Sequence, residues 1–218
     1  NVTQICAMGP ANYVEAQRKY GVLVIAKALR KDKPFHRVAI VVRKDSPIQS
    51  VTDLKGKRFA FGSIGSATSH VIPVAMLKNA GMTVADLRHY EFIGHHDQLI
   101  KDVLDGNFDA AGLIEEQAQK HLADGLRILT VSNEIPEFSI CCNSSVDEET
   151  RDRCRTILTS LRSANEKDIQ ILEPLGKDCT GFLPASEKDY AEFANTIEGV
   201  SDLIAEELQN RQFQPGRR

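Results

Sequence analysis

The chain has 218 residues, of which 42% are hydrophobic and 26% are charged, and its formal net charge is −3. These values predict one or two soluble domains of ordinary globular type. The slight excess of negative charge argues against a nucleic-acid partner, because such partners usually select a basic surface. No apolar run approaches the roughly 20 residues that a membrane-spanning helix needs.

The first two thirds of the chain alternate between strand and helix patterns. Strands are predicted at residues 2–8, 36–43, 58–61, 89–93, 108–114, 126–131 and 138–142. Helices are predicted at residues 11–18, 67–79, 98–105 and 115–121, while residues 21–29 fit either a helix or a strand. Such alternation favours a mostly parallel sheet with helices on both faces.

The last third of the chain is mainly helical in pattern. We expect one long helix over residues 146–164 and a final helix over residues 190–209, in which an interruption at Gly199 is left open. Residues 174–176 and 181–184 read as loops because they combine proline with glycine. The polar residues 212–218 read as a frayed tail.

Five cysteines stand at positions 6, 141, 142, 154 and 179, without the spacing of metal ligands. In a strand, Cys141 and Cys142 would point to opposite faces, which suits neither zinc nor a bond between the two. We therefore expect small buried hydrophobic side chains. The disulfide state and the redox compartment stay open.

The stretch with the clearest site chemistry is DLKGKRFAFGSIGSATSH, residues 53–70. It reads as a turn, a strand, a loop of small residues and a helix start, and the first turn of a helix attracts anions. Ser66, Thr68 and Ser69 add hydroxyl donors, and His70 adds a donor whose charge is tunable. The alternative is that Ser66 only caps the helix while its neighbours are solvated.

Three loops of the predicted sheet carry polar side chains at one edge. They follow the strands at residues 58–61, 89–93 and 108–114, and they contain residues 63–70, 95–97 and 115–116. Ligands of parallel sheets bind beyond the carboxyl ends of the strands. We therefore expect these polar groups to converge on one crevice.

These motifs resemble a known family. The strings GPANY, VVRKDSPIQSVTDLKGK, DLKGKRFAFGSIGSATSH and FIGHHDQLIKDVLDGNFDAAGL are similar to the phosphonate- and phosphite-binding proteins of ABC importers, the PhnD-like type 2 periplasmic binding proteins. The resemblance covers residues 2–131 well and the C-terminal helices loosely.

The resemblance implies an α/β fold of two lobes, each a mostly parallel sheet flanked by helices, with crossing strands at 38–43 and 138–142. Lobe 1 would comprise residues 1–42 and 138–218, and lobe 2 residues 43–137. Family members begin with further elements before the equivalent of Val2, so we expect lobe 1 to lack its N-terminal part.

The resemblance also implies the ligand-binding residues. Phosphonate oxygens would be held by the helix start with Ser66, Thr68, Ser69 and His70, where Ala67 replaces a hydroxyl usual in the family, and by His96 as a second donor. Tyr13 would reach the ligand from lobe 1, and Glu116, with Glu115 beside it, would hold an amine. Their alternatives are a packed aromatic for Tyr13, first-turn carboxylates for the glutamates and a helix-start residue without ligand for His96.

The leading hypothesis is an extracytoplasmic solute-binding protein, periplasmic or membrane-anchored. It would capture a phosphonate, phosphite or phosphate between two lobes for the membrane permease of an ABC importer, without a cofactor. The alternative is the ligand-sensing domain of a membrane signalling protein, a histidine kinase or a cyclase. An enzyme with the same lobes is the weakest option, because the sequence offers no nucleophile–base pair or metal cluster.

Overall fold

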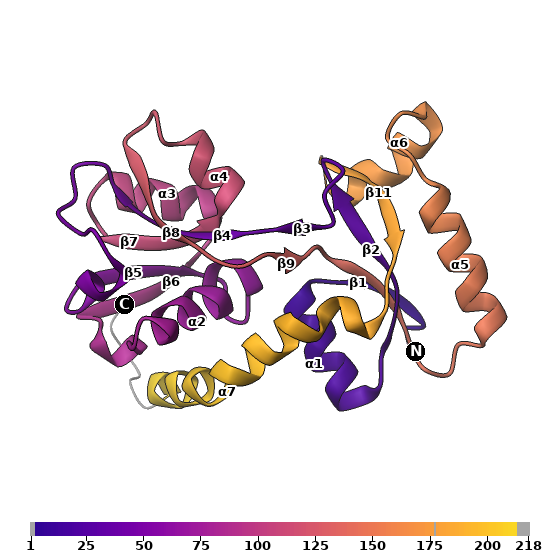
Figure 1. The fold of residues 1–218 in the computed structure, drawn as a ribbon, viewed down its shortest axis with the longest axis horizontal. Helices are drawn as coiled ribbons and strands as arrows, with labels where there is room; N and C mark the ends of the chain where they lie inside the picture. Colours follow the sequence, from indigo (N-terminus) through magenta and orange to yellow (C-terminus); the bar gives the residue numbers. More distant parts are fainter. Residues whose placement is uncertain (1–2, 177, 213–218) are drawn as a thin grey trace. The chain divides into compact units, whose positions relative to one another are not determined.

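The computed structural model describes residues 3–176 and 178–212. The chain divides into two compact units, Asn1–His36 with Glu134–Ala194 as unit 1 and Arg37–Asn133 with Asn195–Arg218 as unit 2. Figure 1 labels the helices and strands of both. The unit boundaries lie a few residues from the expected lobe boundaries, and the chain from Asn195 onward groups with unit 2 instead of unit 1.

Unit 1 contains a four-stranded sheet in the order β1-β10-β2-β11, in which every neighbouring pair is antiparallel. Its strands are β1 (Ile5–Met8), β2 (Leu23–Arg30), β10 (Ser139–Cys142) and β11 (Cys179–Pro184). Its helices are α1 (Pro10–Tyr20), α5 (Glu148–Ser160) and α6 (Glu166–Leu172), and the short strands β3 (Phe35–His36) and β9 (Ile135–Pro136) pair with each other.

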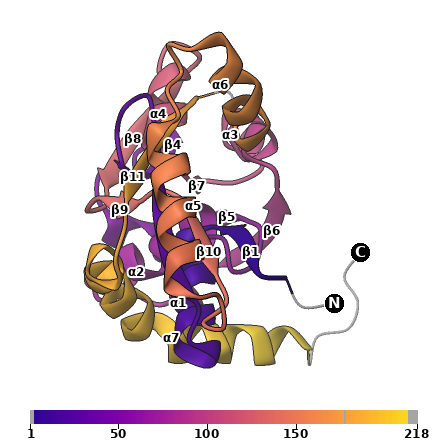
Figure 2. The same cartoon turned by 90° about the vertical axis from the view of Figure 1, so that its right-hand side faces the viewer.

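Helices α1 and α5 cover opposite faces of the unit 1 sheet. Cys141 packs in a cluster with Tyr13 of α1, whereas Cys142 packs in a cluster with Cys154 of α5. Figures 1 and 2 both show α5 alongside this sheet. The prediction that Cys141 and Cys142 point to opposite faces is therefore confirmed, and all five cysteines are free thiols.

Unit 2 contains a five-stranded sheet in the order β6-β5-β7-β4-β8. Its strands are β4 (Val38–Arg43), β5 (Arg58–Gly62), β6 (His89–Gly94), β7 (Ala110–Ile114) and β8 (Leu126–Val131). Its helices are α2 (Ile72–Asn79), preceded without a break by a π-helical turn over Ala67–Val71, then α3 (His96–Leu104), α4 (Glu115–Lys120) and most of α7 (Ala191–Gln212). The core lies where α3 packs on β4 and β7.

The expectation of two mostly parallel sheets was wrong in part. Strand β5 is parallel to β6 and β7, but β4 runs antiparallel to both β7 and β8. In unit 1, β1 and β2 point the same way, as a strand–helix–strand unit requires, but β10 inserts between them in the opposite direction. The alternation of strands and helices correctly predicted that strands joined by a helix run in the same direction, such as β1 and β2. It could not predict that a strand from elsewhere in the chain is inserted between them.

The C-terminal third of the chain differs from its prediction. Helix α5 ends at Ser160 instead of residue 164, because Leu161 is extended and Arg162 bridges to Gly181. Residues 181–184, predicted as a loop, belong to strand β11, and α6 was not predicted. Strand β11 lies at a sheet edge, where a proline such as Pro184 is tolerated.

Two open questions from the sequence are resolved. The ambiguous residues 21–29 form most of strand β2 (Leu23–Arg30), and α7 continues through Gly199 without interruption. Within residues 3–176 and 178–212, none of the helices is long and apolar enough to cross a membrane.

Candidate functional site

The candidate site lies at one edge of the unit 2 sheet. Strands β6, β5 and β7 are neighbours and parallel, so the loops that follow them share this edge. The last residues of two of these strands, Gly62 and Gly94, are paired with each other after a shift of register between Phe61 and Gly62. The three loops that carry the predicted polar residues therefore lie at this edge, and the convergence of their side chains on one crevice stays a prediction.

A cluster of three hydroxyls follows β5. Ser66 caps the helix, and its Oγ accepts the Ser69 hydroxyl at 3.0 Å and the Ser69 N–H at 3.4 Å, with Thr68 Oγ1 at 3.3 Å. The Ser66 carbonyl accepts both His70 N at 3.1 Å and Val71 N at 2.9 Å, which makes the first turn π-helical. Single π turns are frequent at functional sites.

Ala67 and Thr68 occupy the first two positions of this helix. Backbone N–H groups at these positions have no acceptor within a helix, and they carry its positive partial charge. Ser66 and Thr68 are half-buried, whereas Ser69 is buried. The turn therefore combines hydroxyl and N–H donors of the kind that bind oxyanions.

His70 lies beneath this cluster and is fully buried. Its Nδ1 accepts the Gly65 N–H at 3.0 Å, and its Nε2 lies 3.0 Å from Glu207 Oε2. The rings of Phe61 and Phe92 meet the imidazole edge-on at centroid distances of 5.5 and 4.8 Å. Both ring nitrogens are thus engaged within the protein, and a direct contact of His70 with a ligand stays a prediction.

His96 is the first residue of α3 and follows β6. Its side chain is half-buried, and its Nδ1 is a buried atom without a hydrogen-bond partner among the described residues. Burial lowers the pKa of His96, against the opposing charge of Asp97. The neutral imidazole is therefore favoured, and its ring retains hydrogen-bonding capacity for another group.

The two glutamates after β7 are engaged within α4. Glu116 Oε1 lies 3.2 Å from Lys120 Nζ, and Glu115 Oε1 accepts Gln119 Nε2 at 3.1 Å. Both glutamates are half-buried residues of the first helical turn, where carboxylates also complement the helix dipole. The predicted contact between Glu116 and a ligand amine stays a prediction.

Tyr13 belongs to unit 1 and is buried there. Its ring meets Tyr190 at a centroid distance of 4.6 Å and an angle of 64°. The hydroxyl is buried and has no hydrogen-bond partner among the described residues, and burial raises the pKa of Tyr13 far above its usual range. The structure thus shows Tyr13 as a packed aromatic with an unused hydroxyl, and its ligand contact stays a prediction.

Sequence reasoning did not identify Glu207 as the partner of His70. A signal was present, because Val200, Leu203, Ile204 and Glu207 follow helical spacing and form the inward stripe of α7. A carboxylate at the last position of such a stripe indicates a buried partner. The identity of that partner could not be read from the stripe.

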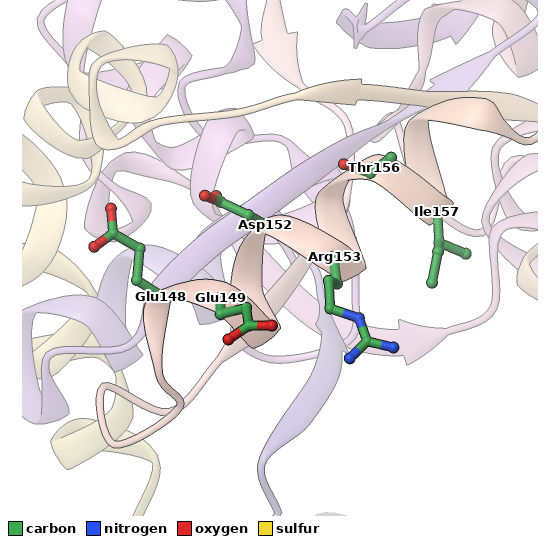
Figure 3. Close-up of a pocket in the computed structure, with 6 residues that line it drawn as sticks. All are labelled: Glu148, Glu149, Asp152, Arg153, Thr156 and Ile157. Carbon is green, nitrogen blue, oxygen red and sulfur yellow. The ribbon is translucent and has the colours of Figure 1, made fainter.

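A separate surface hollow lies on α5 (Figure 3). All of its lining side chains come from this one helix: Glu148, Glu149, Asp152, Arg153, Thr156 and Ile157. No second element contributes to it, and it contains none of the predicted residues. Within the described part of the chain, no three His, Cys, Asp or Glu side chains are grouped so that they could hold a metal ion.

Comparison with known proteins identifies the family of this chain. The family described as "ABC transporter, phosphonate, periplasmic substrate-binding protein" matches residues 1–190. The chain belongs to this family. Membership confirms the predicted family, the periplasmic class and the prediction of a substrate-binding protein instead of an enzyme.

Individual relatives are distant. A probable ABC transporter phosphite-binding protein, PhnD1 of Prochlorococcus marinus, is 24% identical over 180 residues, which cover 73% of this chain and 59% of the relative. The matched region thus spans somewhat more than half the length of that relative.

Solved structures agree on the fold. PhnD1 in complex with methylphosphonate has a TM-score of 0.75 at 21% identity, covering 91% of this chain and 78% of that one. XAC2383 of Xanthomonas citri has a TM-score of 0.79 at 18% identity, covering 92% and 78%. The α/β fold is that of periplasmic binding proteins.

Proposed function

We propose that this chain is the ligand-binding part of an extracytoplasmic solute-binding protein that captures a small oxyanion, a phosphonate, phosphite or phosphate, for the permease of an ABC importer. The observation that carries the proposal is the hydroxyl cluster of Ser66, Thr68 and Ser69 on the first turn of a helix. Hydroxyl and N–H donors there match the oxygens of a tetrahedral anion. The two-lobed capture implied by the family resemblance is part of the proposal.

The relatives support the phosphorus class of ligand. One carries the name of a phosphite-binding protein, and its structure contains methylphosphonate. Small tetrahedral anions of this class have three or four oxygens that accept hydrogen bonds, and the hydroxyl and N–H donors of this turn can meet some of them without a cofactor.

His96 and Glu116 refine the proposal. His96 is a second donor at the same sheet edge, with a buried unpartnered Nδ1. Glu116 would exchange its contact with Lys120 for an amine on the ligand. Titration calorimetry with 2-aminoethylphosphonate and ethylphosphonate tests this role, because Glu116→Gln should weaken binding of the first and leave the second unchanged.

The main experiment is calorimetry of the full-length protein with methylphosphonate, phosphite and phosphate. The double variant Ser66→Ala with Thr68→Val should lower affinity more than tenfold, which corresponds to about 1.4 kcal/mol. The control is Ser63→Ala, because Ser63 lies exposed in the same loop and its carbonyl, not its hydroxyl, makes a hydrogen bond among the described residues, to Ser66 N. Binding of none of the three anions by the wild type, or equal binding by the double variant, would contradict the proposal.

A further inference from the structure

The C-terminal helix runs antiparallel to the helix that carries the hydroxyl cluster. Lys78, near the end of α2, donates a hydrogen bond to the carbonyl of Gly199, and His70, near the helix start, contacts Glu207. The chain advances by the same number of residues from Gly199 to Glu207 as it goes back from Lys78 to His70, about 12 Å along each helix. Figure 1 shows α7 alongside α2 in this unit.

The contact between His70 and Glu207 belongs to a hydrogen-bonded chain of three groups, of which these two side chains are buried. Glu207 and His70 are both fully buried in their side chains, and Oε2 lies 3.0 Å from Nε2. On the other side of the ring, Nδ1 accepts the N–H of Gly65 at 3.0 Å. Because Nδ1 is an acceptor, the ring proton is on Nε2 and is donated to the Glu207 carboxylate. The Glu207 carboxylate of α7 thus stabilises the His70 tautomer whose Nδ1 can accept the Gly65 N–H.

Alternative partners for Glu207 are scarce. Its second oxygen, Oε1, is buried and has no hydrogen-bond partner among the described residues. Phe61 and Phe92 flank the imidazole, so the ring of His70 cannot turn toward water. A buried carboxylate with one oxygen unused depends strongly on the bond that its other oxygen makes.

Gly65 is the link to the anion site. It precedes Ser66 and has a φ of +75°, a conformation that suits glycine and sets the direction in which the chain enters the helix. Its N–H is held by the His70 ring in the turn between Ser63 and Ser66. A shift of the imidazole would move Gly65 and, through it, the Ser66 hydroxyl at the centre of the cluster.

We propose that Glu207 and His70 are positioning residues for oxyanion binding: Glu207 of α7 holds His70, and His70 holds Gly65 and the hydroxyl cluster in place. This inference rests on the proposed function for its consequence on affinity, but the hydrogen-bond chain itself is testable without any ligand. It adds the C-terminal helix to the binding machinery of unit 2.

The test compares Glu207→Leu, Glu207→Gln and the control Glu206→Leu, since Glu206 is the exposed neighbour on the same helix. Two quantities are measured: the affinity for methylphosphonate and the exchange rate of the Gly65 amide proton by NMR. We expect Glu207→Leu to weaken affinity at least fivefold and to accelerate Gly65 exchange at least tenfold. Glu207→Gln should keep the affinity and the Gly65 exchange rate within about twofold of the wild type, because its amide oxygen can accept the hydrogen bond from His70 Nε2.

A measurement on the wild type covers the case in which Glu207→Leu does not fold. The ¹⁵N chemical shifts of His70 should show Nε2 protonated and Nδ1 unprotonated; a protonated Nδ1 overturns the inference, because the Gly65 N–H could not donate to it. Unchanged Gly65 exchange in a folded Glu207→Leu variant also overturns it. If the wild type binds no oxyanion, the proposed function fails, and Gly65 exchange still decides the positioning role.

Discussion

Gly62 and Ser69 approach each other so closely that no side chain fits between them. A Cβ on Gly62 would lie 2.0 Å from Ser69 Oγ and 2.6 Å from Ser69 Cβ, with the Gly94 carbonyl oxygen at 3.3 Å. The end of β5 thus forms the surface on which the Ser69 hydroxyl rests. A second glycine of the same sheet, Gly112, leaves comparable room for Pro73 of α2. The two contacts hold the π-helical turn and α2 against strands β5 and β7.

Gly62→Ala should therefore lower both the stability of the protein and its affinity for an oxyanion. The new methyl group must displace Ser69, and overpacking of this kind costs about 1–3 kcal/mol of unfolding free energy. Because Ser69 donates to Ser66, we also expect affinity for methylphosphonate to fall at least tenfold. Urea denaturation and calorimetry measure the two effects, and a variant with wild-type stability and affinity would show that Ser69 has freedom to move.

A glycine-to-alanine substitution in α7, Gly199→Ala, should instead stabilise the protein. Gly199 is exposed within a helix, and a Cβ there would have no atom within 4 Å. Alanine is favoured over glycine in a helix by about 0.5–1 kcal/mol, so Gly199→Ala should raise the free energy of unfolding by that amount. Urea denaturation measures the change. A loss of stability would mean that the contact between Lys78 and the Gly199 carbonyl depends on the backbone freedom of glycine.

His96 should make oxyanion binding depend on pH. Burial lowers its pKa in the free protein, and a bound anion would favour the charged imidazole, so binding takes up a proton. Affinity should therefore rise as pH falls from about 8 to about 6, by up to tenfold per pH unit. Calorimetry of wild type and His96→Gln with methylphosphonate isolates this effect, because titration of the ligand is common to both. A ratio of affinities that is constant with pH would exclude His96 as the proton acceptor.

Glu137 should make unit 1 sensitive to acid. Its buried carboxyl lies 2.9 Å from His36 Nδ1 and 3.1 Å from Arg30 Nε. Burial acts to raise the pKa of Glu137, but the nearby His36 and the hydrogen-bonded Arg30 outweigh it and hold the pKa below its usual range. A carboxyl with a depressed pKa contributes stability above its unfolded-state pKa of about 4.3, and this contribution is lost as pH falls through the lower folded-state value.

The measurement is urea denaturation of wild type and Glu137→Gln at several pH values. At pH 7 we expect the variant to be less stable by about 1–3 kcal/mol, and the difference should shrink as pH falls below about 4. Glu206→Gln serves as the control for an exposed carboxyl. A difference that does not change with pH would mean that packing of Glu137, and not its charge, stabilises unit 1.

The sequence by itself determined the local elements and the place of the candidate site. The small residues before Ser66 and the helical pattern after it predicted the turn that the structure contains, and β-branched runs predicted β4 and β8. The alternation of strands and helices was enough to place the loops after β5, β6 and β7 at one edge. These features follow from preferences that act over a few residues.

Only the tertiary structure decided which distant segments meet. The insertion of β10 between β1 and β2, and of β4 between β7 and β8, depends on strands far apart in the chain. Strand β11 forms because β2 offers it a pairing edge, although its glycine and proline read locally as a loop. His70 is buried and lies against Glu207, at a sequence separation of 137 residues. Such contacts are set by the burial of the whole chain, and local propensity does not encode them.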